Sequence, residues 1–436
     1  MLPSGGACWE QCPAELGVSG LIYLAYETLR RSTRPMAWLL DKGQQLARDE
    51  RNPLRDTIGM RALATAWELP ARALKDYPKQ AYQVWEDLDD ADVVVDAEVV
   101  HSLPFADLLR FNREDGTKKP KVLIAAALSG HHATLLEDTI RGFTRDFDTY
   151  ITDWKDAKQV PLAAGEFDFD GYVEHLMTFL EVLGPDTHVV ATCQAAPPAM
   201  VAAAVLEARK AKHKPATLTL MGGPIDTRVS PNVLTKLTEK VPFKLFKTLN
   251  IHTVPPGYPG SGRRVYPGFY QLSGFIALNP KPHIRQYGQF PKNSIKGDEV
   301  ALQKFRDFYD EYFAVLDMAE GFYLDTLKKV FFEHHIPKGI MEYRGKLVDF
   351  ASVKDLPLLT VEGENDNFCP PGQTEAAHDV FSGIPANKRK NYIQPGVGHY
   401  GVFSGSKFQS SIYPVIRDFI HEAVGIEAKE EIPVTQ

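Results

Sequence analysis

An unbroken apolar segment constrains the fold of this chain more than any other feature. Residues 121–128 read KVLIAAAL, with no polar side chain after Lys121. Such a segment suits a strand that is buried on both faces, as the strands of a parallel sheet are. Because parallel strands are joined by crossover connections, usually helices, the segment predicts an α/β architecture.

Strand and helix patterns alternate around this segment. We expect further strands at 92–95, 99–100, 105–111, 148–152, 188–192, 217–221, 358–361 and 390–393. We expect helices at 134–143, 169–183, 198–210 and 408–423. This alternation is typical of an α/β domain with a mostly parallel sheet.

The chain divides into three regions. Apolar residues recur at helical spacing over 20–85, beginning with Leu21, Leu24 and Ala25, which predicts an N-terminal helical extension over 1–90. About 135 residues without a convincing β pattern separate the strand ending at 221 from the strand beginning at 358, far more than an ordinary connection. We therefore expect an inserted helical cap over 225–354. The core then comprises 91–224 and 355–436.

Composition excludes several classes of protein. The 49 Lys and Arg residues against 56 Asp and Glu residues give a net charge of −7, which argues against nonspecific nucleic-acid binding. No apolar run approaches the roughly 18 residues of a membrane span. Four cysteines do not make a disulfide framework. Cys8 and Cys12 lack a second Cys/His pair nearby, so we interpret them as incidental thiols rather than zinc ligands. The N-terminus has neither the basic start nor the apolar core of a secretory signal, so we expect a cytoplasmic protein.

The segment 190–196, VATCQAA, lies where a predicted strand gives way to a helix. The α/β-hydrolases hold their nucleophile on a strained turn at this place, normally Gly-x-Ser-x-Gly. Ala191 and Ala195 supply the small residues two positions before and after Cys193. The turn would direct the Cys193 thiol into a cleft, where a helix N-terminus favours the thiolate. The alternative is a small buried cysteine at the end of a core strand.

Two further candidate residues follow late strands. Residues 361–366 read VEGEND, and we choose Asp366 over Glu364 as the acid that orients a histidine, because Asp366 lies further out on the loop. Residues 395–401 read PGVGHYG, where glycines on both sides would let the loop present His399 to a cleft. A solvated acidic loop and a surface histidine are the alternatives. The order nucleophile, acid, histidine matches that of the hydrolases, and all three lie at the carboxyl ends of predicted strands, where open α/β sheets hold their sites.

The segment 128–132, LSGHH, ends the first apolar strand. In hydrolases this loop supplies one backbone N–H of the oxyanion hole, and the residue after the nucleophile supplies the other. We therefore assign this role to the main-chain N–H groups of Ser129 and Gln194. Side chains of the adjacent His131 and His132 diverge, and no carboxylate or cysteine lies at ligand spacing, so we expect no metal. The predicted chemistry requires no cofactor.

Several segments resemble the intracellular polyhydroxybutyrate depolymerases of bacteria. They are LSGHHATLLE (128–137), YITDW (150–154), TLMGGPIDTR (219–228), VYPGFYQL (265–272), FYDEY (308–312) and VGHYGVFSG (397–405). The resemblance runs from about residue 20 to about residue 425. It implies an α/β-hydrolase fold, a catalytic Cys, Asp and His, and action on storage polyester granules. By motif these residues are Cys193, Asp366 and His399. Ala195 stands where the family pattern has proline, and alanine suits the same tight turn.

The expected chemistry is ester hydrolysis through an acyl-cysteine. His399 would take the proton of Cys193, Asp366 would hold the histidine tautomer, and the thiolate would attack the ester carbonyl. A hydroxyacyl thioester exchanges readily with thiols, so water and coenzyme A are both candidate acceptors. The expected partners are amorphous polyhydroxybutyrate or the granule surface, and coenzyme A, in the cytoplasm at storage granules. The oligomeric state stays open.

The expected cap is rich in aromatic residues. They are Tyr258, Tyr266, Phe269, Tyr270, Phe275, Phe305, Phe308, Tyr309, Tyr312, Phe313, Phe322 and Tyr323. One interpretation is a hydrophobic groove for a polyester chain, with Tyr266, Tyr270, His131 and His132 as substrate-binding candidates. The other is a core for the cap itself, because several of these residues repeat at helical spacing. We favour the second interpretation for most of them.

Two other functions compete with hydrolysis. A polyester synthase would share the fold and the Cys–Asp–His set but run acyl transfer towards polymer, and its nucleophile segment usually has glycines where this chain has Ala191 and Ala195. A non-catalytic granule-coating protein would need an amphipathic surface rather than a nucleophile turn. Release of 3-hydroxybutyrate from granules, followed against polymer growth from the acyl-CoA, separates the three.

Overall fold

A central eight-stranded sheet organises the chain in the computed structural model, which describes residues 18–82, 84–88, 91–111, 119–278 and 280–425. Cys8 and Cys12 therefore lie outside the described residues. Across the sheet the order is β15 (Arg389–Gln394), β14 (Leu358–Gly363), β8 (Leu218–Met221), β7 (Thr187–Thr192), β5 (Lys121–Ala125), β6 (Asp148–Trp154), β4 (Ala106–Phe111) and β3 (Ala97–Ser102). The first six run parallel to one another. At one edge β4 pairs antiparallel with β6, and β3 pairs antiparallel with β4.

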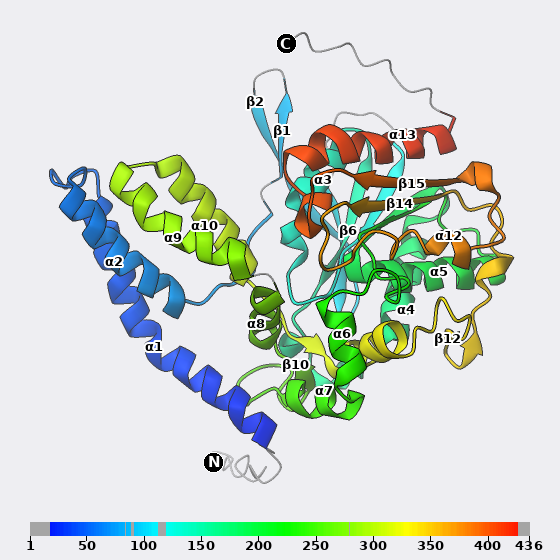
Figure 1. Ribbon diagram of the computed structural model, residues 1–436, viewed down its shortest axis with the longest axis horizontal. Coiled ribbons are helices and arrows are strands. Elements are labelled where there is room, and N and C mark those ends of the chain that lie inside the picture. The colour runs from blue at the N-terminus through cyan, green and yellow to red at the C-terminus, as the bar shows by residue number, and fades with distance from the viewer. Residues whose placement is uncertain (1–17, 83, 89–90, 112–118, 279, 426–436) are drawn as a thin grey trace, which may run out of the picture.

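The strands at the centre of this sheet are buried on both faces. Every residue of β7, β8 and β14 is buried, and so are four of the five residues of β5. Helices α3 (Glu137–Thr144) and α13 (Tyr413–Ala423) lie on one side of β14 and β15, and α4 (Phe169–Leu183) and α5 (Ala196–Ala208) lie on the other (Figure 1). The short α12 spans Ala377–Val380. The predicted α/β-hydrolase fold, with a mostly parallel central sheet, is confirmed.

The long segment between β8 and β14 is mostly helical. Its helices are α6 (Val233–Lys240), α7 (Phe243–Asn250), α8 (Gly268–Leu278), α9 (Pro280–Lys296), α10 (Glu299–Phe313) and α11 (Glu320–Thr326). It also contains short strands that the sequence pattern did not reveal: β9 (His252–Thr253), β10 (Arg264–Tyr266), β11 (Met318–Ala319), β12 (Glu342–Tyr343) and β13 (Lys346–Leu347). Strands of two or three residues are too short to produce an alternating pattern of apolar and polar residues.

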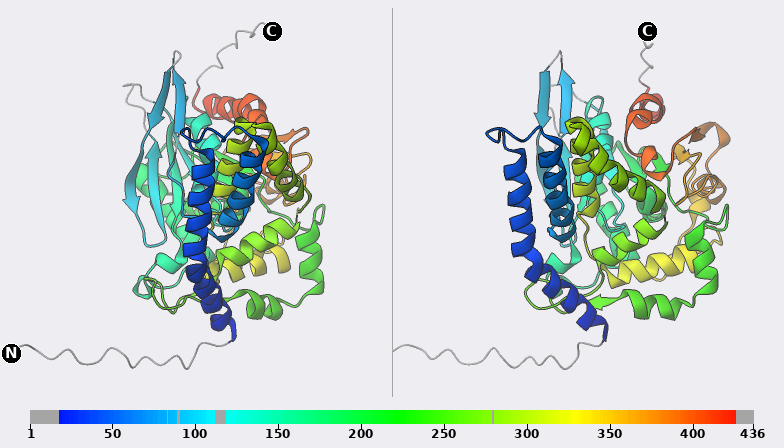
Figure 2. Two further views of the ribbon diagram at one scale, coloured as in Figure 1. Left: turned by 90° about the vertical axis from the view of Figure 1, so that its left-hand side faces the viewer. Right: turned by 60° about the vertical axis from the view of Figure 1, so that its left-hand side comes forward.

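Two antiparallel helices begin the described chain. Helix α1 (Val18–Arg48) continues through Pro35, and α2 (Ile58–Leu74) contains Pro70 near its end. An internal proline removes one hydrogen bond and bends a helix, and α1 changes direction along its length (Figure 2). A hairpin of β1 (Val84–Leu88) and β2 (Ala91–Val95) then projects from the body. No helix in the described ranges is long and apolar enough to cross a membrane.

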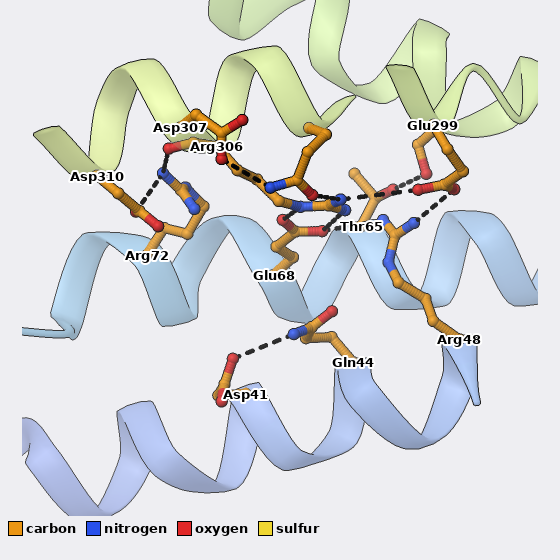
Figure 3. Close-up of polar contacts among 12 residues, drawn as sticks. Asp41, Gln44, Arg48, Thr65, Glu68, Arg72, Glu299, Arg306, Asp307 and Asp310 are labelled. Carbon is orange, nitrogen blue, oxygen red and sulfur yellow. Dashed lines mark hydrogen bonds and ion pairs between the residues drawn. The ribbon is translucent and has the colours of Figure 1, made fainter. Parts of the chain in front are cut away.

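The N-terminal helices pack against α9 and α10 through buried charges (Figure 3). Glu68 of α2, only 3% exposed, accepts two hydrogen bonds from Arg306 of α10, at 2.6 and 3.0 Å, and one from Arg48 of α1 at 2.9 Å. Arg72 of α2 donates to Asp310 of α10 at 2.8 Å. Removing one partner of such a group would leave a buried charge uncompensated, at a cost of about 3–5 kcal/mol. The four helices therefore form one unit beside the sheet (Figures 1 and 2).

Candidate active site

Cys193 lies on a strained turn at the carboxyl end of β7. The turn, Cys193–Ala195, leads directly into α5, whose first turn carries prolines. Cys193 has a φ of 49°, a left-handed conformation that costs a non-glycine residue about 1–3 kcal/mol. Ala191 and Ala195 are fully buried on either side, while the Cys193 side chain is half-buried. The turn thus holds a partly accessible thiol at the carboxyl edge of the sheet and at the start of a helix.

Gly223, just beyond β8, is the residue that lets this turn fit. A Cβ at position 223 would lie 2.2 Å from the Cβ of Ala196 and 3.0 Å from the carbonyl oxygen of Cys193. The neighbouring Gly222 has a φ of 54°, and a Cβ there would lie 3.5 Å from the His399 ring and 3.6 Å from an Asp366 carboxylate oxygen. Both glycines therefore allow a second strand end to approach the candidate residues. We did not single out either glycine from the sequence.

Asp366 is held in one orientation by its own loop. Its Oδ1 accepts hydrogen bonds from the backbone N–H groups of Phe368 and Cys369, both at 2.8 Å. Its Oδ2 lies 2.7 Å from Nδ1 of His399. A carboxylate can only accept a hydrogen bond. The hydrogen is therefore on Nδ1 of His399, which donates a hydrogen bond to Asp366. The Asp366 side chain is fully buried, which excludes water from this bond.

His399 lies between Asp366 and Cys193. It begins a short turn after β15 and is 8% exposed. Of the glycines that flank it, Gly396 adopts a left-handed φ of 74°, whereas Gly398 does not. Because Nδ1 bonds Asp366, Nε2 is the ring nitrogen that stays available to the nearby Cys193. The structure thus brings together the three residues that the sequence singled out.

Electrostatics at this site favour a charged histidine. Burial alone lowers the pKa of His399, but the negative charges of Cys193 and Asp366, and the hydrogen bonds to both, raise it to about 10. The arrangement therefore supports a protonated His399 beside Cys193, and a cationic histidine next to a cysteine makes that cysteine more reactive. Phe368 and Phe403 pack against the imidazole, each with its ring centroid 5.2 Å from that of His399.

A buried carboxylate that we did not predict organises the loop of Asp366. Glu362, in β14, is fully buried and accepts backbone hydrogen bonds from Gly372 at 3.0 Å, Thr374 at 2.7 Å and Glu375 at 3.2 Å. The Thr374 hydroxyl donates in turn to the carbonyl of Gly223 at 3.0 Å. This chain of bonds ties the acid loop to the strand end beside Cys193. The only sequence signal is an acidic residue inside an otherwise apolar strand.

The two candidate oxyanion donors are near Cys193 for different reasons. Gln194 is its neighbour in the chain, and Ser129 follows the strand that pairs with β7. Gln194 is the second residue of the turn after β7, and the first N–H groups of a helical turn have no partner within it. Ser129 follows β5, the strand that neighbours β7. The loop of Ser129 is fixed by the cap: the carbonyl of Gly130 accepts from the N–H of Leu316 at 2.8 Å. A Cβ at Gly130, whose φ is 86°, would lie 2.9 Å from Gln271 of α8.

His131 and His132 have different surroundings. The ring of His131 packs against Phe275 and Tyr312 of the cap, at centroid distances of 5.3 and 5.0 Å. Burial lowers the pKa of His131 to about 4, despite hydrogen bonds to the backbone of Tyr312 and Ser129. His132 instead borders a separate cavity. Among the described residues, no three His, Cys, Asp or Glu side chains gather as metal ligands would.

Tyr266 and Tyr270 make their ring contacts within the cap. Tyr266 of β10 lies against Tyr323 of α11, with centroids 4.1 Å apart, and Tyr270 of α8 lies 4.8 Å from His252. These contacts do not bring either tyrosine to Cys193. Buried side chains of α9 and α10 form a second cluster, in which Leu302 joins the aromatic residues Phe290, Phe305, Tyr309 and Tyr312. Much of the cap's aromatic content therefore forms a core for the cap.

Comparison with known proteins relates the chain to polyhydroxyalkanoate metabolism. The family model described as "PHB de-polymerase C-terminus" matches residues 222–424, which include Asp366 and His399 but not Cys193. The chain is also 25% identical over 150 residues to the poly(3-hydroxyalkanoate) polymerase subunit PhaC of Haloarcula marismortui. That match covers 34% of this chain, which spans only 30% of the length of the polymerase subunit.

Solved structures with a similar arrangement have low sequence identity. A lipase from Acinetobacter baumannii is 12% identical with a TM-score of 0.40, covering 75% of this chain and 93% of its own. A monoglyceride lipase from Saccharomyces cerevisiae is 10% identical with a TM-score of 0.43, covering 80% and 98%. A non-heme bromoperoxidase from Mycobacterium tuberculosis is 15% identical with a TM-score of 0.44, covering 76% and 100%. The sheet topology and both sequence matches together describe an α/β-hydrolase-fold chain related to proteins of polyhydroxyalkanoate metabolism, without separating depolymerase from polymerase.

Proposed function

We propose that this protein hydrolyses the ester bonds of poly(3-hydroxybutyrate) storage granules with a Cys193–His399–Asp366 triad. The observation that carries the proposal is His399, which bonds Asp366 through Nδ1 and leaves Nε2 for Cys193, the nearby group whose charge helps to raise the pKa of His399. A nucleophile, a base and an orienting acid in this order are the parts needed for acyl transfer. Both sequence matches are to proteins named for polyhydroxyalkanoate chemistry, which supports this polymer as the proposed substrate.

The reaction follows from the positions of these groups. The Cys193 thiolate attacks the ester carbonyl, and the oxyanion receives hydrogen bonds from the N–H groups of Ser129 and Gln194. Each such donor typically contributes about 10²–10³ in rate. The His399 imidazolium then protonates the departing alkoxide, which leaves as the hydroxyl end of the shortened chain.

The second half of the reaction regenerates the enzyme. Neutral His399 removes a proton from water, the hydroxide attacks the hydroxyacyl thioester, and the Cys193 thiolate departs with a new carboxyl end released. Coenzyme A can replace water as the acceptor, in which case the product is a hydroxyacyl-CoA. Asp366 keeps the Nδ1 proton in place throughout. The proposed location is the surface of cytoplasmic granules.

A polymerase is the second candidate, because one sequence match is to a polymerase subunit. The same acyl-cysteine would then receive a hydroxyl chain end instead of water, and an acyl-CoA would supply the acyl group. The experiment that decides uses the purified chain on amorphous granules, with Cys193→Ala as the control. Release of 3-hydroxybutyrate supports hydrolysis, and release of hydroxyacyl-CoA supports the same cleavage with coenzyme A as the acceptor. Polymer growth from 3-hydroxybutyryl-CoA overturns the proposed depolymerase function.

The physical state of the polymer offers a further test. A single site beneath a cap can accept only a mobile chain segment, and mobile segments are scarce in crystalline polymer. We therefore expect turbidity loss from amorphous granules and almost none from solvent-extracted crystalline polymer at equal surface area. Comparable rates on the two preparations would contradict the granule proposal.

A further inference from the structure

A cavity of about 770 Å³ lies outside the triad, and the proposed reaction does not yet use it. Its walls come from α1, from the segment after α2, from β4, from the end of β6, from the loops that follow β5 and β6, and from the segments before β10 and β11. Sites for small organic ligands generally have volumes of about 300–1,000 Å³. The cavity is therefore large enough for a short oligomer rather than a single ion.

The cavity lies at the same edge of the sheet as Cys193. Trp154 ends β6 and borders it, while Cys193 follows β7, and β5 alone separates these two strands. Neighbouring strands are about 4.8 Å apart, so the two strand ends are about 10 Å apart. His132 and Val315 form the nearer wall, and Val315 pairs with His131 of the candidate oxyanion loop. The loop of Ser129 thus has the triad on one side and the cavity on the other.

Cationic side chains outnumber carboxylates in this lining. Three arginines of α1 and three lysines face four aspartates. Asp76 is shared between Arg30, at 2.7 Å, and Arg34. Arg31 comes no closer than 4.0 Å to Glu27, beyond hydrogen-bond distance, and its side chain is 50% exposed. The wall formed by α1 therefore has positive charge that the neighbouring carboxylates do not fully neutralise.

The opposite wall contains a polar group without a partner. His132 is 8% exposed, and its Nδ1 is buried with no hydrogen-bond partner. Buried polar side-chain atoms almost always have one. Burial, together with the charges of Lys79, Lys158 and His131, lowers the pKa of His132 to about 3, so its ring is neutral near pH 7. His132 therefore presents a neutral ring to the cavity rather than a further cation.

From these observations we infer that the cavity binds the free carboxylate end of a hydroxyacid chain. The carboxylate pairs with Arg31 on α1, and the chain runs from there past His132 towards the loop of Ser129. The inference rests on the proposed function and deepens it, because it makes the enzyme select polymer ends and short oligomers that have a free carboxylate. The hydrolysis itself continues to supply such ends, since each cleavage creates one.

The test compares two substrates that differ only in this charge. The trimer of 3-hydroxybutyrate is used as the free acid and as its methyl ester, and kcat/KM is measured for each. We expect the wild-type protein to favour the acid about tenfold or more, the effect of one charge-assisted hydrogen bond. Arg31→Gln should reduce this preference at least severalfold. Arg51→Gln, at a side chain that is 90% exposed and outside the cavity, is the matched control and should leave the preference unchanged.

Direct binding separates this inference from the proposed function. Titration of the trimer acid into Cys193→Ala by calorimetry should show binding that weakens about tenfold in Arg31→Gln and with added salt. If the wild-type protein hydrolyses neither substrate while this binding persists, the proposed function fails and the site stands. Equal rates on acid and methyl ester, or no binding of the acid, overturn the inference. Inorganic phosphate is titrated in the same way. If phosphate binds with the same dependence on Arg31 while the trimer acid does not bind, the inference of a carboxylate site is overturned.

Discussion

Replacing Asp366 with asparagine tests how the triad works, because the substitution keeps the shape and removes the charge. The pKa of His399 is raised from 6.5 to about 10, a preference for the imidazolium of about 5 kcal/mol. Cys193 and Asp366 are the charges that produce it against the effect of burial. If Asp366 contributes half, its loss costs about 2–3 kcal/mol, which lowers the equilibrium constant between the ion pair and the neutral pair by roughly 10²-fold.

The tautomer adds a second loss. The NH₂ group of an asparagine side chain cannot accept a hydrogen bond from Nδ1. His399 would therefore favour the tautomer with its hydrogen on Nε2, the nitrogen on the side of Cys193. In a serine protease triad the equivalent change lowers kcat about 10⁴-fold. We therefore expect kcat of Asp366→Asn to fall by about 10²–10⁴, with little change in KM.

The assay uses a soluble ester such as p-nitrophenyl butyrate beside amorphous granules. Asp355→Asn, at a side chain that is 79% exposed, is the matched control. The asparagine oxygen can still accept from Phe368 and Cys369, so the loop should keep its conformation, and circular dichroism checks this. A loss of less than tenfold in kcat would refute the assignment of Asp366 as the orienting acid.

Three further predictions concern the thiol, the turn and the histidine. Iodoacetamide should inactivate the protein by modifying Cys193 before Cys369, because Cys369 is 2% exposed and burial raises the pKa of its thiol; peptide mapping of an inactivated sample with Cys193 unmodified would contradict this. Gly223→Ala should lower the free energy of unfolding by about 1–3 kcal/mol through overpacking and should reduce kcat, whereas Gly59→Ala, with open space around its Cβ, should change neither in urea unfolding and rate assays. Because the pKa of His399 is raised, its charge stabilises the fold fully below pH 6.5, and this contribution to the free energy of unfolding should decline by a few kcal/mol as the pH rises to about 10. Urea unfolding of the wild-type protein and of Cys193→Ala across this pH range measures the decline. An equally steep decline in both proteins would disprove the interaction between His399 and Cys193.

Local patterns were sufficient to place the three central residues. Cys193, Asp366 and His399 each follow a strand that the sequence pattern predicts, and parallel strands bring their carboxyl ends to one edge. Three separate local predictions therefore become one prediction, that the three side chains lie close together at this edge. The order of the strands across the sheet was not needed for that step.

The supporting residues could not be predicted in this way. Gly223 matters because β8 lies beside both β7 and β14, and that adjacency is not visible in either segment alone. Glu362 reads as an exception in an apolar strand until the three N–H groups that it binds are known. Both roles depend on contacts between residues far apart in the chain.

The N-terminal helices gave the least complete prediction. Their helical pattern was visible, but their attachment to the cap was not, because Glu68 and Arg306 are separated by 238 residues. Charged residues on a helix usually indicate a solvated face, whereas Glu68 is buried and Arg306 is half-buried between the helices. Packing between distant segments decides whether such a face is solvated or buried between helices.

Trapping of the acyl-enzyme tests the central claim most directly. The purified protein is mixed with the 3-hydroxybutyrate trimer, quenched in acid within the first turnover, digested and analysed by mass spectrometry. The account predicts a hydroxybutyryl or oligomeric acyl group on the peptide that contains Cys193, removed by hydroxylamine and absent from Cys193→Ala. An acyl group on any other residue, or steady turnover by Cys193→Ala, would contradict it.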